Sequence, residues 1–547
     1  MSKIETSVFT NKVQAIRNLE NRMHSPLSYL QEDYEAVYKR EEIQIGNPDL
    51  AQYFFDEMAR KNTVCIVGAQ FGDEGKGRFV DNKLQEILGR EGVKKAYVVR
   101  YQGGSNAGHT VYSPEGVKLP LHQVPSSVFE ARAVGIMDTG MIINMEDLRT
   151  EIEDSEKLVG DLRGRLILSN DAILNTDLER AMEVLNVLKT GGKSEGGTRR
   201  GISPSYANKL LRYHLTIASL FDANWREELG KRYDALEKEF NLFSTKPLSE
   251  QIVPDLRAIR NQDTTVRTVG DKKTYLDRLE AVREWFLSRD NDQPIENQLR
   301  QNTFLLHHAI KNDVSNGLLF EGSQAIGLHK DIGRLPDVTA SDTSVYGITA
   351  GTSLYRADDV EEKIGVFKLT YMSSVGSAKM LTAIDIPREA VETTDGYDDD
   401  QLYGLKVREV AQEKGTTTGR YRDICFLDLA LMRYNILMGG IESLAGTHAD
   451  LAWENQPVKV CTHYTNEKGD VVPYQPGIQY QEGLTPHYIE LPGWSGDEVR
   501  NATSMEDLPL NAKKFFSFVQ RQLGVPIIAL TTGPERHHLL NTTYYDN

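Results

Sequence analysis

The sequence predicts an α/β protein. Short apolar runs, at residues 64–67, 96–99 and 317–320, have the composition of buried strands, and each run leads into a glycine-containing loop. The first of these loops precedes residues 79–88, whose apolar spacing suits an amphipathic helix. Strands that pass through glycine-rich loops into helices are typical of an α/β sheet.

Composition narrows the possible partners. The chain has 547 residues, enough for two to four domains or for one large α/β domain with insertions. Its net charge of −16 argues against nonspecific nucleic-acid binding, because a duplex would repel this surface. No apolar run approaches the length that spans a membrane, and the start lacks the apolar core of a signal peptide. We therefore expect neither a nucleic-acid nor a membrane partner.

The cysteines indicate a reducing compartment. Cys65, Cys425 and Cys461 are widely spaced and odd in number, which argues against a disulfide framework and against a zinc site. A cytoplasmic location is the expectation.

Residues 1–60 are charged, and their apolar residues recur at helical spacing. They contain no chemical motif. We expect a helical N-terminal extension that packs on the main domain; a partner-binding arm is the alternative.

Residues 68–78 have the pattern of a phosphate-binding turn between a strand and a helix. Glycines let backbone N–H groups approach an anion, the helix N-terminus adds partial positive charge, and Lys76 adds a full charge. The common P-loop differs, because it has a glycine at the position of Gln70 and a metal-binding Ser or Thr at that of Gly77. An acid, Asp73, lies inside the turn instead. A carboxylate beside phosphate is repelled unless it binds a metal or accepts a proton from a substrate.

Three further segments have the composition of ligand-binding loops. Residues 101–110 place Asn106 and His109 in a glycine-rich loop directly after a strand. Residues 197–206 form a small-residue turn flanked by arginines, which suits a phosphate monoester. Residues 415–422 combine hydroxyls with two arginines that could bind a dicarboxylate. Each segment taken alone could equally be a structural turn.

Taken together, the motifs resemble those of the adenylosuccinate synthetase family. Residues 70–77, QFGDEGKG, resemble the family's N-terminal signature, which usually has Trp at the position of Phe71. Residues 100–110 match the family motif RxQGGxNAGHT. Similar segments follow in the family's order at residues 121–127, 197–212, 320–324, 336–343, 415–422, 444–450, 491–494 and 531–536.

The sequence also departs from the family pattern elsewhere. Only Val375 and Gly376 survive of the family's VGxGPFPTE loop, and His448 replaces the lysine of the family's LTKLD segment while Asp450 is kept. Residues 213–315 are rich in charges and helix formers, and this stretch is longer than its counterpart in the family.

The resemblance implies a single large P-loop-like α/β domain, residues 61–547, around a mostly parallel sheet, with a helical subdomain or insertion at 213–315. It also implies a homodimer and a reaction that joins IMP and L-aspartate, with GTP and Mg²⁺, to give adenylosuccinate, GDP and phosphate. Arg212, which follows a segment expected to be helical from Pro204, would reach the site of the neighbouring subunit.

The same resemblance implies roles for individual residues. Asp73, His109 and Lys76 are the expected catalytic residues, and the Asp73 carboxylate and the Gly108 carbonyl are the expected metal ligands. The expected GTP-binding residues are Gly75, Gly77, Thr110, Arg422, Asp450, Thr531 and Gly533. The expected IMP-binding residues are Asn106, Thr198, Arg212, Gln324, Thr339 and Val375, and aspartate is expected at Thr417, Thr418 and Arg420.

Three alternatives stay open. A noncatalytic nucleotide-binding homologue would fit the altered loop at residues 375–382 and His448, although the presence of Asp73, Lys76 and His109 argues against it. A relative acting on a 2-amino purine nucleotide such as dGMP is expected to lack the carboxylate at Asp73. Use of ATP in place of GTP is the third alternative, because His448 is shorter than the lysine it replaces.

Overall fold

The computed structural model describes residues 22, 29–30, 33–34, 62–113, 116–191, 198–255, 266–291, 293–294, 297–311, 313, 315–374, 380–387, 396–414 and 421–541. Within these ranges the chain forms the α/β fold predicted from the sequence. None of the described helices combines the length and the hydropathy needed to span a bilayer.

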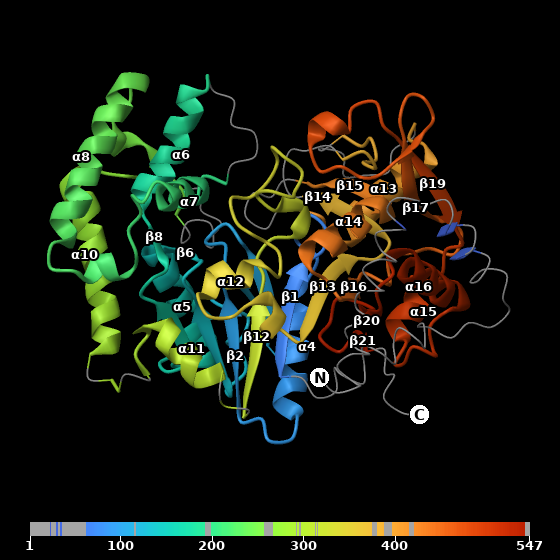
Figure 1. The fold of residues 1–547 in the computed structure, drawn as a ribbon, viewed down its shortest axis with the longest axis horizontal. Coiled ribbons are helices and arrows are strands. Elements are labelled where there is room, and N and C mark those ends of the chain that lie inside the picture. The colour runs from blue at the N-terminus through green and yellow to red at the C-terminus, as the bar shows by residue number, and fades with distance from the viewer. Residues whose placement is uncertain are drawn as a thin grey trace.

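The fold is built around a ten-stranded sheet (Figure 1). Its strands lie in the order β11 (Arg300–Gln301), β7 (Leu166–Ser169), β5 (Ala133–Met137), β2 (Lys95–Arg100), β12 (Asn316–Glu321), β1 (Thr63–Gly68), β13 (Glu362–Lys368), β16 (Ser443–Thr447), β20 (Ile527–Thr531) and β21 (Leu539–Asn541). Every neighbouring pair is parallel except β20 with β21. The predicted mostly parallel sheet is therefore confirmed.

Strand β1 lies in the middle of this sheet and is buried on both faces. Val64 and Ile66 point into one hydrophobic cluster, whereas Cys65 and Val67 point into another. This alternation is the period-two pattern of a strand covered on both sides, so a continuous apolar run is required. The carboxyl end of β1 is thereby fixed at the centre of the sheet, where the phosphate turn begins.

Helices cover both faces of the sheet. The helices of the described residues are α4 (Lys76–Gly89), α5 (Met145–Val159), α6 (Asp177–Lys189), α7 (Ile202–Leu210), α8 (Trp225–Phe243), α10 (Lys272–Asp290), α11 (Thr303–Lys311), α12 (Gly347–Thr352), α13 (Asp399–Val410), α14 (Leu429–Gly439), α15 (Gly496–Asn501) and α16 (Leu510–Leu523). Helix α4 packs its apolar side on one face together with Val64 and Ile66. Helices α12, α14 and α16 contribute to the large cluster on the other face.

Smaller sheets flank the central one. A five-stranded sheet contains β14 (Tyr371–Ser374), β15 (Asp423–Asp428), β17 (Val458–Thr465), β18 (Val471–Val472) and β19 (Thr485–Leu491). Three two-stranded sheets pair β3 (His109–Tyr112) with β4 (Lys118–Leu121), β6 (Ile142–Asn144) with β8 (Ile173–Asn175), and β9 (Ile252–Val253) with β10 (Arg267–Thr268).

The stretch 213–315 contains more than helices. Helices α8 and α10 stand at one end of the molecule, opposite α15 and α16 (Figure 1). Three short strands, β9, β10 and β11, also fall within it, and β11 pairs with β7 at the edge of the central sheet. The end of this stretch is therefore part of the sheet itself.

The described residues of the N-terminal segment lie against the main domain. Leu30 and Tyr34 pack on the large hydrophobic cluster. Asp33 is buried, where it pairs with Arg22 at 2.5 Å and accepts a 2.7 Å hydrogen bond from Gln522 of α16.

Candidate active site

The phosphate turn connects β1 to α4. Gly72 and Gly75 have positive φ angles of 94° and 87°, and Gly75 is the residue that precedes the helix. A side chain at Gly77 would place its Cβ 2.9 Å from the Thr110 carbonyl oxygen. The close packing of Thr110 on the helix start therefore explains why glycine occupies the position at which a P-loop has a hydroxyl.

Glu74 is a buried acid of this turn to which sequence reasoning assigned no role. It accepts a 2.6 Å hydrogen bond from the Gly72 amide, and it pairs with the Lys76 ammonium at 2.9 Å. The expected phosphate-binding lysine is thus paired with a carboxylate beside it. The sequence Asp73-Glu74 does not indicate which of the two acidic side chains is buried in the protein.

Asp73 has the outward position. It adopts a left-handed conformation, with φ of 57°, and its side chain is 44% exposed. Its carboxylate contacts the guanidinium of Arg422. Turn residues 68–77 and the segment that begins at Tyr421 are therefore brought together, although they are far apart in the sequence.

A buried acid, Glu413, supports Arg422. It pairs with Arg422 at 2.8 Å and accepts a 2.6 Å hydrogen bond from the Tyr371 hydroxyl, and it also contacts Lys368. Burial by itself raises the pKa of Glu413, but Lys368 and Arg422 outweigh burial and hold this pKa well below its usual range. Burial lowers the pKa of Arg422, and Asp73 and Glu413 outweigh burial and raise it. The Glu413 carboxylate thus fixes the arginine that contacts Asp73.

His109 begins β3 and lies above the carboxyl ends of β2 and β12. Its Nδ1 is 3.2 Å from Nη1 of Arg100, and its Nε2 is 3.7 Å from Oε1 of Glu321. Arg100 and Glu321 are register partners in the parallel sheet. Burial, followed by the positive charge of Arg100, lowers the pKa of His109 to about 4. Because a guanidinium only donates, Nδ1 accepts and the assigned neutral tautomer carries its proton on Nε2.

Two expected IMP-binding residues hold buried polar atoms without hydrogen-bond partners among the described residues. These atoms are Oδ1 of Asn106 and Nε2 of Gln324. Gln324 also has a positive φ of 56°. Thr339 is placed close to this segment by a 2.8 Å hydrogen bond from its amide to the Leu328 carbonyl. Orphaned buried polar groups and backbone strain are common where a ligand binds.

The donor set expected for a metal suits Mg²⁺. The Asp73 carboxylate is half-exposed, and Gly108 is exposed in the loop before His109. Both offer oxygen donors, and Mg²⁺ is usually bound through one or two carboxylates together with phosphate oxygens and waters.

The ends of β16 and β20 lie side by side. The Thr531 hydroxyl accepts a 3.2 Å hydrogen bond from the His448 amide, and the Thr531 carbonyl accepts one of 3.1 Å from Ala449. Asp450 follows in this loop and pairs with Arg500 at 3.0 Å. The loop predicted to hold a base and the Thr531 segment are therefore adjacent.

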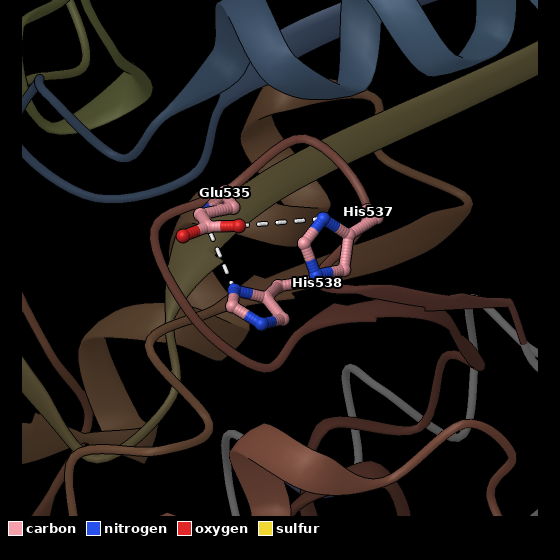
Figure 2. A group of neighbouring side chains, drawn as sticks. All are labelled: Glu535, His537 and His538. Atoms are coloured by element: carbon pink, nitrogen blue, oxygen red, sulfur yellow. Dashed lines mark hydrogen bonds and ion pairs between the residues drawn. The ribbon is translucent and has the colours of Figure 1, made fainter. Parts of the chain in front are cut away.

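The turn after β20 is held on the phosphate-turn helix. Arg78 of α4 donates a 2.6 Å hydrogen bond to the Gly533 carbonyl and one of 2.8 Å to the Pro534 carbonyl. The turn continues through Glu535, His537 and His538 (Figure 2). Gly533 packs so closely that a Cβ there would lie 2.6 Å from Nδ1 of His538.

His448 is partly buried and adopts a left-handed conformation, with φ of 61°. Burial, followed by Lys368, lowers its pKa to about 4. Its ring contacts Tyr371 edge-on at 5.6 Å between centroids. The imidazole is therefore neutral near pH 7, where the lysine expected from the family pattern would be charged.

The arginine-flanked turn, residues 198–201, is fixed by acids from neighbouring helices. Glu183 of α6 accepts hydrogen bonds from the amides of Arg199, at 3.1 Å, and Gly201, at 2.7 Å. Arg200 pairs with Asp147 at 3.3 Å. Thr198 is left exposed at the start of this turn.

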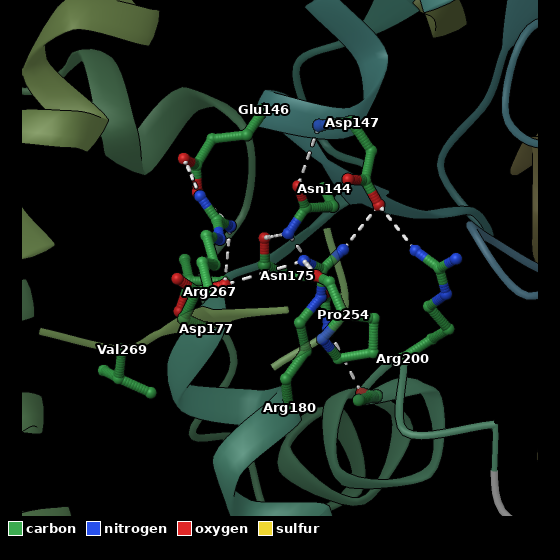
Figure 3. A network of polar contacts seen from close by, with 12 residues as sticks. Asn144, Glu146, Asp147, Asn175, Asp177, Arg180, Arg200, Pro254, Arg267 and Val269 are labelled. Carbon is green, nitrogen blue, oxygen red and sulfur yellow. Dashed lines mark hydrogen bonds and ion pairs between the residues drawn. The ribbon is translucent and has the colours of Figure 1, made fainter. Parts of the chain in front are cut away.

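Asp147 belongs to a buried ionic network (Figure 3). It also contacts Arg180, whose other guanidinium nitrogen donates to the Pro254 carbonyl at 2.8 Å. Beside it, Arg267 of β10 bridges Glu146 and Asp177. The network ties the turn at residues 198–201 to the segment around β9 and β10.

The helix expected to carry Arg212 ends at Leu210. Arg212 lies beyond this helix end with a positive φ of 60°, and it is exposed. Its neighbours Leu210, Leu211 and Tyr213 are exposed by 86%, 74% and 48%. The expected sites Val375, Thr417, Thr418 and Arg420 lie outside the described residues.

The fold and this site define an α/β protein with a glycine-rich, lysine-containing turn at the carboxyl edge of a parallel sheet. The family model for adenylosuccinate synthetase matches residues 65–540. The chain is 30% identical over 483 residues to an adenylosuccinate synthetase of Chlorobaculum parvum, covering 88% of this chain and 98% of that protein. It is 32% identical over 479 residues to one of Xanthomonas euvesicatoria, covering 87% and 98%.

A solved structure agrees with these sequence matches. The fully ligated adenylosuccinate synthetase of Plasmodium falciparum is similar with a TM-score of 0.71 and 26% identity, over 88% of this chain and 100% of that one. The chain therefore belongs to the adenylosuccinate synthetase family of enzymes.

Proposed function

We propose that this chain catalyses the GTP-dependent ligation of L-aspartate to IMP, through 6-phosphoryl-IMP, to give adenylosuccinate, GDP and phosphate. Family membership supports the reaction class. The observation that carries the proposal is the position of Asp73, a half-exposed acid within a phosphate turn that has no metal-binding hydroxyl.

The chemical difficulty is that the 6-oxo group of a purine is a poor leaving group. Asp73 accepts the proton from N1 of IMP, so that O6 attacks the γ-phosphorus of GTP. The amine of aspartate then attacks C6, and phosphate leaves with the former O6. The Asp73 carboxylate and the Gly108 carbonyl would hold Mg²⁺, which when bound would supply charge neutralisation for the transferring group.

His109 and Lys76 stabilise the charge that develops on the transferring phosphoryl group. His109 donates from Nε2, whose proton is fixed there by the contact of Nδ1 with Arg100. Lys76 exchanges its contact with Glu74 for the phosphate oxygens, together with the amides of Gly75 and Gly77 and the Thr110 segment. The Asp73–Arg422 contact opens when the nucleotide binds Arg422.

The remaining residues bind the two acceptor substrates. Asn106, Gln324 and Thr339 hold IMP, and the unpartnered polar atoms of Asn106 and Gln324 support this assignment. Thr198 holds the 5′-phosphate, and Val375 borders the nucleotide. Thr417, Thr418 and Arg420 hold the carboxylates of aspartate, since an arginine pairs with a carboxylate in bidentate fashion.

The guanine base of GTP binds beside Thr531 and Gly533. Asp450 accepts from the N1–H and N2–H₂ donors of guanine, which adenine lacks. Its ion pair with Arg500 keeps the carboxylate oriented and leaves acceptor capacity for the base.

The proposed active form is a homodimer. Arg212 is exposed among apolar side chains, which suits a subunit contact from which it reaches the partner's IMP site. A cytoplasmic location is proposed because all three cysteines are buried free thiols.

The test is an omission experiment on the full chain. Purified protein is mixed with IMP, GTP, Mg²⁺ and L-aspartate, and formation of adenylosuccinate is followed by its absorbance and by mass spectrometry. Product should require all four components, and Asp73→Asn should serve as the inactive control. Absence of product with all four present would refute the proposal, and a clear preference for dGMP over IMP would replace the substrate.

A further inference from the structure

The turn between β20 and β21 gathers one carboxylate and two imidazoles. One ligand atom each of Glu535, His537 and His538 lies within 4.8 Å of the others (Figure 2). We propose that this turn is a binding site for a transition-metal ion of the Zn²⁺ type. The site is separate from the Mg²⁺ ligands Asp73 and Gly108, and its existence does not depend on the reaction proposed above.

The ligand set favours a borderline metal. Imidazole nitrogen together with carboxylate oxygen suits Zn²⁺, Co²⁺ and Ni²⁺, whereas Mg²⁺ prefers oxygen donors alone. Three protein ligands leave a fourth position for water, as in open zinc sites.

The distances require only small side-chain movements. In a tetrahedral zinc site with bonds near 2.1 Å, two ligand atoms lie about 3.4 Å apart. Nδ1 of His537 is already 3.5 Å from Oε2 of Glu535. The two imidazole rings are 4.3 Å apart between centroids.

His538 presents a lone pair toward this group. Its Nδ1 accepts a 3.2 Å hydrogen bond from the Glu535 amide, which places the proton of the neutral ring on Nε2. A metal at the site takes this lone pair in exchange for a long hydrogen bond. The Glu535 amide is then free to bond water, because Glu535 is exposed.

The turn is anchored on both sides of the ligands, so little ordering is needed when a metal binds. Arg536 makes a bidentate ion pair with Asp81 of α4, at 2.7 and 2.9 Å. Arg78 donates to the carbonyls of Gly533, Pro534 and Glu535. The Asp81 carboxylate also offsets the charge of Arg536, which reduces the repulsion between this arginine and a bound cation.

The experiment measures Zn²⁺ binding to the nucleotide-free full chain by competition with a chromophoric chelator. We expect one site per chain in the wild type. His537→Asn and Glu535→Gln should each weaken binding at least about tenfold, because removal of a direct ligand should cost no less than removal of an outer-shell partner. His308→Asn, an exposed imidazole on α11, is the matched control and should leave the affinity unchanged.

Two further measurements do not require His537→Asn or Glu535→Gln to fold. Co²⁺ added to the wild type should give the intense visible absorption of a four-coordinate site, and excess Zn²⁺ should remove this absorption. Asp73→Asn should keep the Zn²⁺ site. Unchanged affinity in His537→Asn, loss of the site in Asp73→Asn, or a Co²⁺ spectrum of the six-coordinate aqueous type would each overturn the proposal.

Discussion

The carboxylate of Asp73 contacts the guanidinium of Arg422, which in turn is paired with the buried Glu413. The proposed catalytic base and a proposed nucleotide-binding arginine are thus partners within the described structure. In the proposed reaction, nucleotide bound to Arg422 would free the Asp73 carboxylate for N1 of IMP and for the metal. The ion pair would then link occupancy of the nucleotide site to the availability of the base.

Asp73→Asn should keep the fold and lose at least about a hundredfold in turnover, the low end for removal of one general base. The amide cannot accept the N1 proton and is a weaker metal ligand. Steady-state kinetics test this, with Asp234→Asn, an exposed acid of α8 paired with Lys272, as the matched control. Near-normal turnover in Asp73→Asn would remove the base assignment.

His109→Asn should flatten the pH dependence of the unfolding free energy between pH 6.5 and pH 4. His109 is neutral in the fold down to a pKa of about 4, whereas the unfolded chain takes up the proton near pH 6.5. The neutral ring therefore contributes stability above pH 6.5 that is lost as the pH falls to 4. The contribution is on the order of 3 kcal/mol.

Urea unfolding at pH 6.5, 5 and 4 measures this difference between wild type and His109→Asn. His308→Asn changes an exposed histidine and is the control. Its unfolding free energy should depend on pH as in the wild type. If the unfolding free energies of wild type and His109→Asn depended on pH in the same way, burial would not hold His109 neutral.

At pH 7 the same variant should bind IMP but lose turnover. Loss of IMP binding instead would make His109 a structural residue.

Mixing Arg212→Leu with Asp73→Asn protein should restore activity that neither preparation has alone. If Arg212 serves the partner's site, a hybrid dimer contains one intact site, so complete exchange recovers about a quarter of wild-type activity. Mass spectrometry of labelled subunits verifies the exchange. Mixtures that exchange and yet stay inactive would contradict a shared site.

Turnover with GTP should exceed turnover with ATP by on the order of ten- to a hundredfold. Adenine offers Asp450 no bidentate pair of donors, so the carboxylate keeps Arg500 as a partner but gains none from the base. His448 also covers less of the base than a lysine stem. Turnover with both nucleotides at matched Mg²⁺ tests this preference. Asp450→Asn should narrow it without abolishing the chemistry, and equal use of ATP by the wild type would show that Asp450 does not read the base.

The sequence predicted the strand, turn and helix around residues 64–88 because their signals are local. Apolar runs specify buried strands, and glycines specify the left-handed positions at Gly72 and Gly75. The α/β class and the mostly parallel sheet are confirmed. The roles assigned to individual site residues stay predictions.

Interactions between distant segments could not be predicted from the sequence. Glu413 is one acid among many in the sequence, and only the fold brings it to Lys368, Tyr371 and Arg422. Glu183 likewise shows its role only where it meets the amides of Arg199 and Gly201. The end of α7 at Leu210 also had only a weak local signal, because Lys209 lies in the last turn but neither glycine nor proline follows directly.

In the proposed reaction O6 of IMP attacks the γ-phosphorus of GTP and later leaves C6 as part of the released phosphate. IMP labelled with ¹⁸O at the 6-oxo position tests it most directly, with the released phosphate analysed by mass spectrometry after turnover with GTP, Mg²⁺ and L-aspartate. We expect one ¹⁸O atom in each phosphate released. Unlabelled phosphate, with the label in water or still on the purine, would contradict it.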